Sequence, residues 1–212
     1  MGIKWFGQSC FEIKTAQGTI VADPFGDSIG FVMPSLRADV LTISHQHFDH
    51  NNRAKVAARQ IIETPGAHQA GEIKITGWLA PHDEQGGAQR GQVIIFKFEA
   101  EGINLVHLGD LGTVLSDIQV SQVGRADILF IPVGGKYTLD ISQAVNVARL
   151  LQPKIIVPMH YRVPGLKIDL AGPEEFINQL GITPEYLDKL EIRSPIELEK
   201  PPRLVILNRV TS

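Results

Sequence analysis

The segment at residues 45–50, His-Gln-His-Phe-Asp-His, places the tightest constraint on what this chain can form. Three imidazoles and one carboxylate crowd into it, although the whole chain has only 7 histidines. Imidazole nitrogen and carboxylate oxygen are the preferred ligands of zinc and related divalent ions. A solvated loop with chance histidines is the alternative explanation, and it predicts no related pattern elsewhere in the chain.

The spacing inside this segment indicates how the ligands divide. Residues two apart in an extended segment share a face, so His45 and His47 can bind one ion together. Asp49 and His50 lie past the bend and can face a second ion. Phe48 is expected to anchor the segment in the core.

A related pattern does occur elsewhere, because candidate ligands follow several short apolar runs that predict strands. With the preceding run in parentheses, these are Asp23 (20–22), His45 (40–43), His82 (73–79), Asp110 (103–108) and His160 (155–157). Strand ends at one edge of a sheet can converge on a shared site. We therefore expect these side chains to meet.

The combined set predicts a site for two metal ions. One ion would be held by His45, His47 and His82, and the other by Asp49, His50 and His160. Asp110 could bridge the ions, since a carboxylate has two oxygens. A water between the ions would be deprotonated near neutral pH and become the nucleophile. Asp49 and His160 are also the predicted catalytic residues.

Apolar runs and helical spacing predict the remaining elements. Strands are expected at 20–22, 40–43, 61–63, 73–79, 93–98, 103–108, 127–133, 155–157 and 204–207. Helices are expected at 52–59, 115–123, 142–151 with Ser142 as a possible N-cap, 174–180 and 184–190. Two packed sheets with helices outside would use these elements well. With no repeat or linker, residues 1–212 are expected to form a single domain, and 194–202 a connection into the last strand.

Composition narrows the class of protein. The net charge of −3 and dispersed basic residues predict no nucleic-acid partner. The single cysteine, Cys10, excludes an intramolecular disulfide. We find neither a secretory signal pattern nor an apolar run long enough for a membrane helix, so no membrane partner is expected and the default expectation is a cytoplasmic protein.

The motif His-x-His-x-Asp-His, with a later His, Asp and His, resembles the metallo-β-lactamase superfamily. Further carrying segments are 5–11 (WFGQSCF), 22–25 (ADPF), 107–110 (HLGD), 132–140 (PVGGKYTLD) and 158–161 (PMHY). The resemblance runs from the first residues to His160. Within the superfamily it is strongest to small prokaryotic metal-dependent hydrolases, in the neighbourhood of ascorbate-6-phosphate lactonase and N-acyl-phosphatidylethanolamine phospholipase D.

The resemblance implies an α+β fold, a four-layer αββα sandwich with the metals at one edge. It also implies that Asp23 orients the histidine segment by hydrogen bonding to a ligand imidazole. One departure is Gln8 in Gly7-Gln8-Ser9, where relatives often have histidine. Gln8 can donate and accept hydrogen bonds but cannot titrate, which puts an acid–base role at this position in doubt.

Several other polar residues have a functional and a plain interpretation. Lys136, Tyr137, Tyr161 and Arg162 lie beside site segments, where a cation and phenols would suit an anionic substrate. Ordinary polarity at the rim explains them equally well. Asp83 is expected to be a solvated loop carboxylate, and His107 a hydrogen-bonded core residue.

The sequence therefore predicts a hydrolase that uses metal-activated water on an ester-like bond: a phosphodiester, phosphoester, lactone or carboxylic ester. Two divalent metal ions are expected as cofactors, with zinc favoured and manganese or iron as alternatives. The expected partner is a small-molecule substrate, and a homo-oligomer is compatible with the sequence. A non-catalytic metal-binding sensor or scaffold on the same fold, and an RNA-processing nuclease, are the competing hypotheses.

Overall fold

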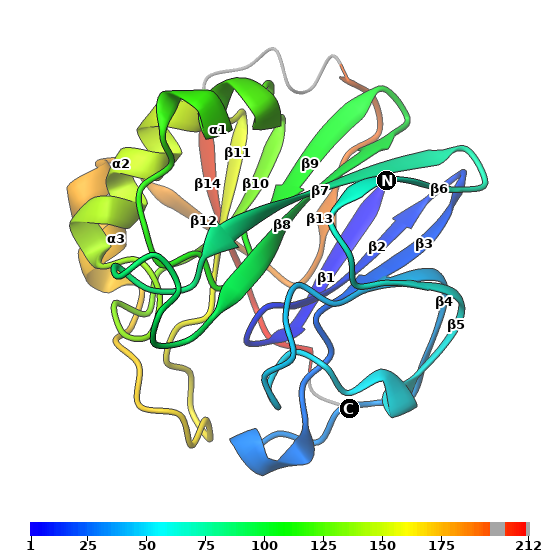
Figure 1. Cartoon of the computed structure of the whole chain (residues 1–212), viewed down its shortest axis with the longest axis horizontal. Helices are drawn as coiled ribbons and strands as arrows, with labels where there is room; N and C mark the ends of the chain where they lie inside the picture. The colour runs from blue at the N-terminus through cyan, green and yellow to red at the C-terminus, as the bar shows by residue number, and fades with distance from the viewer. Residues whose placement is uncertain (196–201, 211–212) are drawn as a thin grey trace.

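Two β-sheets packed face to face form the centre of the molecule (Figure 1), a computed structural model that describes residues 1–195 and 202–210. The six-stranded sheet has the order β13-β1-β2-β3-β4-β5. Its strands are β1 (Gly2–Gly7), β2 (Cys10–Thr15), β3 (Gly18–Ala22), β4 (Leu36–Thr42), β5 (Val56–Ile62) and β13 (Leu190–Glu191).

The eight-stranded sheet has the order β12-β14-β11-β10-β9-β8-β7-β6. Its strands are β6 (Gly66–Ala70), β7 (Ile73–Pro81), β8 (Gln92–Ala100), β9 (Ile103–His107), β10 (Ile128–Pro132), β11 (Ile155–Met159), β12 (Pro184–Leu187) and β14 (Arg203–Leu207). The α-helices lie outside this sheet in Figure 1; they are α1 (Asp117–Val123), α2 (Ile141–Leu151) and α3 (Glu174–Leu180).

Alternating side chains divide the apolar residues between two clusters, because neighbours along a strand point to opposite faces. Ile20 and Val40 join the large core cluster, whereas the next residues, Val21 and Leu41, join a smaller one. The large cluster joins the two sheets, with the rings of Phe11 on β2 and Phe130 on β10 only 4.4 Å apart.

The smaller cluster lies on the outer face of the six-stranded sheet. It includes Phe25, Ile29, Phe31 and Met33, which belong to the connection between β3 and β4. The short 3-10 helix η1 (Asp27–Ile29) lies in this connection. The predicted α+β sandwich is therefore confirmed, with a loop and a 3-10 turn covering this face of the sheet.

Two predicted helices are wrong. Residues 52–59 form the 3-10 helix η2 (Arg53–Lys55) and the start of β5, which pairs in parallel with β4 over six registered positions. Residues 184–190 contain β12, which pairs with β14. In both cases inter-strand hydrogen bonding overrides the local pattern. Most of the predicted connection at 194–202 lies outside the described residues.

The other predicted helices and all nine predicted strands correspond to elements of the structure. The N-cap of α2 is Asp140 and not Ser142. The Asp140 carboxylate accepts from the amide of Gln143 at 2.7 Å, and Gln143 Oε1 accepts from the amide of Asp140 at 2.9 Å. Such reciprocal capping satisfies two amides at the helix start. No described helix is long and apolar enough to cross a membrane.

Strand direction brings several chain segments to one edge of the sandwich. β9, β10 and β11 pair in parallel, and β7 and β9 are both antiparallel to β8, so β7 runs in the same direction as β9. In the other sheet, β3, β4 and β5 are parallel. The loops that follow β7, β9 and β11 therefore leave the eight-stranded sheet at the same end.

Replacing Phe130 with alanine should destabilise the protein by about 3–5 kcal/mol, because it removes a large ring from the closed space between the sheets. Phe130 is fully buried. Urea unfolding followed by circular dichroism measures the change. Ile118→Ala is the control, since Ile118 is 71% exposed and its loss should change stability by at most about 0.5 kcal/mol. Equal effects of the two substitutions would contradict the placement of Phe130.

Candidate metal centre

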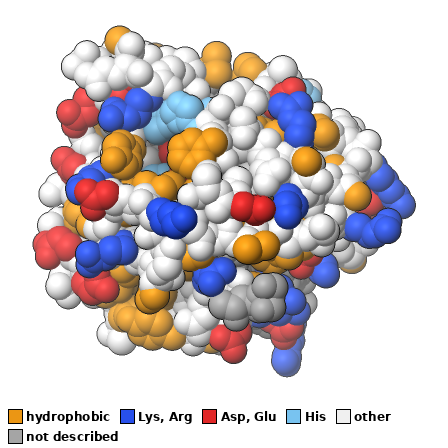
Figure 2. All heavy atoms as spheres, turned by 90° about the horizontal axis from the view of Figure 1, so that it is seen from below, with side chains coloured by type: hydrophobic (Ala, Val, Ile, Leu, Met, Phe, Trp, Pro, Cys, Tyr) orange, Lys and Arg blue, Asp and Glu red, His pale blue; other side chains and the backbone are white. Residues whose placement is uncertain are grey.

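The seven candidate ligands meet at the edge where these strands end. They form two neighbouring groups, and within each group the ligand atoms lie within 4.8 Å of one another. The first group is His45, His47 and His82, and the second is Asp49, His50, Asp110 and His160. Histidine side chains reach the surface beside apolar and basic ones on the face seen in Figure 2. The structure thus brings together residues up to 115 positions apart in the chain (160 − 45).

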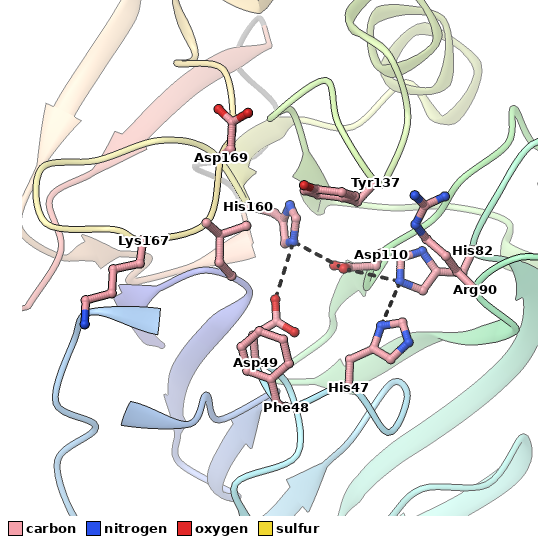
Figure 3. Close-up of a pocket in the computed structure, with 11 residues that line it drawn as sticks. His47, Phe48, Asp49, His82, Arg90, Asp110, Tyr137, His160, Lys167 and Asp169 are labelled. Carbon is pink, nitrogen blue, oxygen red and sulfur yellow. Dashed lines mark hydrogen bonds and ion pairs between the residues drawn. The ribbon is translucent and has the colours of Figure 1, made fainter. Parts of the chain in front are cut away.

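The first group consists of imidazoles alone. His47 Nδ1 lies 3.0 Å from His45 Nε2 and 3.2 Å from His82 Nε2 (the contact to His82 is dashed in Figure 3). His45 and His47 follow β4, whereas His82 follows β7 in the other sheet. Three nitrogens from two sheets thus surround one point, an arrangement that suits a cation with nitrogen ligands.

The second group centres on the carboxylate of Asp110, at the end of β9. Asp110 Oδ2 lies 3.2 Å from both His50 Nε2 and His160 Nε2. The same oxygen lies 3.6 Å from His82 Nε2 and 3.9 Å from His45 Nε2, in the first group. Asp110 therefore stands between the two groups, where a bridging carboxylate would have to be.

Asp23 fixes which nitrogen atoms face the cluster. Its Oδ2 accepts from His50 Nδ1 at 2.9 Å and from Ser44 Oγ at 2.5 Å. Because the single hydroxyl proton of Ser44 goes to Asp23, Ser44 Oγ accepts from His45 Nδ1, 2.9 Å away. The Nε2 atoms of His45 and His50 are thereby turned toward the cluster with their lone pairs available. Ser44 was missed in the sequence, although it directly precedes His45.

When the cluster holds no cation, burial and the neighbouring charges shift the pKa values of its imidazoles in different directions. Burial and the nearby His50 lower the pKa of His45 to about 3. Burial also disfavours a charged His160, but Asp110 outweighs it and raises the pKa of His160 to about 9. The pKa of His50 is raised in the same way, by Asp110 and Asp49. The carboxylates thus demand positive charge within the cluster, supplied either by protons or by bound cations.

Buried polar atoms that lack hydrogen-bond partners indicate that bound cations, and not protons, supply this positive charge. Among the described residues, the buried atom Asp110 Oδ1 has no hydrogen-bond partner, and His50 Nε2 has only ion-pair contacts to carboxylate oxygens, the shorter at 3.2 Å to Asp110 Oδ2. Leaving such groups buried and unsatisfied is unfavourable, and almost all buried polar atoms in proteins have partners. Imidazole and carboxylate lone pairs are typical ligands of divalent metals, so the residues present fit two such ions.

Gln8 ties the second group to the core. Its Nε2 donates to Asp49 Oδ2 at 3.0 Å, and its backbone carbonyl accepts from the amide of His160 at 3.1 Å. The Trp5 indole donates to the same carbonyl at 2.8 Å. Gln8 therefore positions two candidate ligands by hydrogen bonding alone, which needs no titratable group.

The cluster opens into a cavity of about 490 Å³. The residues that complete its lining are Phe48, Arg90, Tyr137, Lys167, Ile168 and Asp169 (Figure 3). Phe48 is 57% exposed and faces this cavity, so its predicted anchoring in the core is wrong. Of the six, only Tyr137 was singled out in the sequence as a substrate contact.

The other predicted substrate contacts lie differently. Lys136 pairs with Asp169 at the rim. Tyr161 is buried with its ring stacked 5.0 Å from that of Trp5, so it is a core residue and its predicted substrate contact is withdrawn. Arg162 is exposed and outside the lining.

Two predictions about nearby polar residues have opposite outcomes. His107 is buried and its Nε2 bonds the carbonyl of Ser9 at 2.9 Å, which confirms a hydrogen-bonded core histidine. Asp83 is 5% exposed, and its carboxylate accepts from the amides of Gln85, Gly87, Gln89 and Arg90. The prediction of a solvated Asp83 is therefore wrong, because this carboxylate organises the whole β7–β8 loop.

Both the sequence and the structure of this chain are similar to those of known proteins. A β-lactamase superfamily domain profile matches residues 2–160. The chain is 28% identical to a metal-dependent hydrolase from Thermoplasma acidophilum (92% of this chain, 98% of that protein) and 31% identical to one from Methanosphaera stadtmanae (80% and 88%). A proposed zinc-dependent hydrolase of the metallo-β-lactamase superfamily from Thermotoga maritima superposes with a TM-score of 0.81, at 37% identity over 97% of each chain.

Replacing Asp23 with asparagine should weaken zinc binding about tenfold to a hundredfold, because a neutral amide holds the His50 imidazole less firmly in orientation. Competition against a chromophoric zinc chelator measures the affinity. Asp39→Asn is the matched control: Asp39 also accepts a backbone hydrogen bond, from Thr19 at 2.8 Å, but stands in β4 away from the cluster. An unchanged zinc affinity in Asp23→Asn would show that the orienting hydrogen bond is dispensable.

Proposed function

The chain belongs to the β-lactamase superfamily, and we propose that it is a hydrolase with two divalent cations that cleaves an ester-like bond in a small molecule. One observation carries this proposal: Asp110 Oδ2 faces His50 and His160 on one side and His82 and His45 on the other. That position serves two cation sites at once. The hydrolase names of the relatives support the class of reaction.

The donor atoms favour zinc. The group of His45, His47 and His82 offers nitrogen alone, which suits zinc best, while the mixed oxygen and nitrogen donors of the second group also accept manganese or iron. When bound, such cations polarise the substrate and lower the pKa of water toward neutrality.

We assign Asp49 and His160 to catalysis as well as to cation binding: both border the cavity, as three other candidate ligands do, and Asp49 Oδ2 lies 3.8 Å from His160 Nε2. Burial opposes ionisation of Asp49, but His50 and His160 hold its pKa far below the usual range. Bound cations would favour the ionised carboxylate in the same way as protonated imidazoles do, so Asp49 can accept a hydrogen bond and orient a water molecule in the cavity. His160 Nε2 lies 3.2 Å from Asp110 Oδ2 and 3.8 Å from Asp49 Oδ2, so it contacts both carboxylates.

The cavity suits a small substrate. Its volume of about 490 Å³ lies within the range of small-molecule sites. Phe48 and Ile168 offer apolar contact, while Arg90 and Lys167 offer positive charge. The connection to a cavity also favours an enzyme over a closed structural metal site, since a catalytic metal keeps a position open to water or substrate.

The reconstituted protein should bind about two zinc ions per chain, with turnover lost on chelation and restored by zinc. Elemental analysis and assays with bis(4-nitrophenyl) phosphate, aryl esters and lactones test this. His47→Ala and His160→Ala should each remove one ion while retaining the other. Fewer than one bound metal per chain, with no metal-stimulated turnover, would contradict the proposal, whereas bound metal without turnover of any of these substrates would favour a non-catalytic sensor. Cleavage of structured RNA at physiological salt would instead favour a nuclease.

Asp49→Asn should lower kcat by about a hundredfold or more, as expected for loss of a group that orients the attacking water. The assay uses whichever model ester the wild-type protein hydrolyses, at matched metal content. Asp117→Asn, in the exposed first turn of α1, is the control and should leave kcat unchanged. Wild-type kcat in fully metallated Asp49→Asn would remove Asp49 from catalysis.

A further inference from the structure

Arg90 is a half-buried cation that faces the cavity without a counter-charge. Its guanidinium lies 5.4 Å from the centre of the Tyr137 ring. The one side-chain hydrogen bond of this guanidinium goes to Gln89 Oε1 at 3.4 Å, and no carboxylate of residues 1–195 or 202–210 lies within 4.0 Å of a guanidinium nitrogen. Arginines removed from water normally pair with an anion, so this one is available for an anionic ligand.

The position of Arg90 is built into the fold. The loop from β7 to β8 closes with the amide of His82 bonded to the carbonyl of Gly91 at 3.1 Å. Inside it, the Asp83 carboxylate accepts the amide of Arg90 at 2.7 Å and that of Gln89 at 2.9 Å. Because Asp83 directly follows the candidate ligand His82, one short segment positions both His82 and Arg90, whose side chains line the cavity together (Figure 3).

Neighbouring charges decide on which side of Arg90 an anion would bind. A second cavity of about 430 Å³ shares Arg90 and Tyr137 with the first, but its lining includes Glu84 and Asp140, which repel anions. In the first cavity, Asp169 is paired with Lys136, and Asp49 and Asp110 face imidazoles. An anion is therefore favoured on the side of the metal cluster.

We propose that Arg90 binds a second anionic group of the substrate, a carboxylate or a phosphate, that is separate from the bond that is cleaved. The exposed ring of Phe48 and the ring of Tyr137 would hold the apolar part between that anion and the reacting bond. Asp83 acts as a positioning residue through the backbone of Arg90. This inference rests on the proposed function, because it assigns the anion to the substrate of that site.

Calorimetric titration of the zinc-loaded chain with succinate and with inorganic phosphate tests the anion site directly. Arg90→Gln should raise the Kd about tenfold or more, as expected for loss of a charge-assisted hydrogen bond. Arg37→Gln is the matched control: Arg37 is exposed near the start of β4, and the candidate ligands follow the other end of that strand. Equal Kd values in Arg90→Gln and wild type, or no binding of either anion by wild type, would overturn the proposal.

The same titration after chelation separates this inference from the proposed function. If the chain holds no metal or hydrolyses no ester, the proposed function fails, while the Arg90-dependent Kd still decides the anion site. With turnover present, 4-nitrophenyl acetate and mono(4-nitrophenyl) succinate compare a neutral and an anionic ester of one leaving group. Arg90→Gln should raise KM for the succinate ester alone, with kcat little changed; an equal change in KM for both esters would overturn the role.

Asp83→Asn tests the positioning role, because an amide can no longer accept from all four loop amides. It should raise the Kd for succinate, as Arg90→Gln does. The double variant should bind no more weakly than Arg90→Gln alone, since Asp83 acts through Arg90. Additive losses in the double variant would show that Asp83 influences the anion by another route.

Discussion

The buried carboxylate of Asp23 is the constraint on which the rest of the site depends. It joins the end of β3 to Ser44 and His50 beyond the end of β4, and burial opposes its ionisation while the hydrogen bond from His50 holds its pKa below the usual range. One acceptor group thereby determines the tautomers of His45 and His50. Only with both Nε2 atoms turned inward do the imidazoles of one sheet face His82 and Asp110 from the other.

The sequence predicted this convergence because its signals are local. A His or Asp directly after an apolar run marks the end of a strand, and parallel strands end at one edge. The helix predicted at residues 52–59 is wrong because the strand that begins there depends on pairing with β4, which no local pattern shows. The predicted N-cap of α2, Ser142, lies two residues after the observed one, Asp140. Differences of this size are typical of helix boundaries.

The walls of the cavity could not be predicted, for a different physical reason. Arg90, Lys167 and Phe48 lie on loops whose course depends on contacts distant in sequence. The amides that bond to Asp83 are close in sequence, belonging to Gln85, Gly87, Gln89 and Arg90, but an aspartate followed by a glycine-rich stretch is equally typical of a solvated turn. Tyr161 shows the converse: it follows His160 directly, yet its ring turns into the core against Trp5.

Arg90 and Tyr137 line both cavities and so act as a partition between them. Both residues belong to loops, whereas most of the candidate cation ligands are set by strand ends. Exchanging the partition for smaller side chains would merge two compartments of about 490 and 430 Å³ without touching any ligand. The length of molecule that fits beside the cluster could therefore change through these two loop residues alone, with every candidate ligand kept in place.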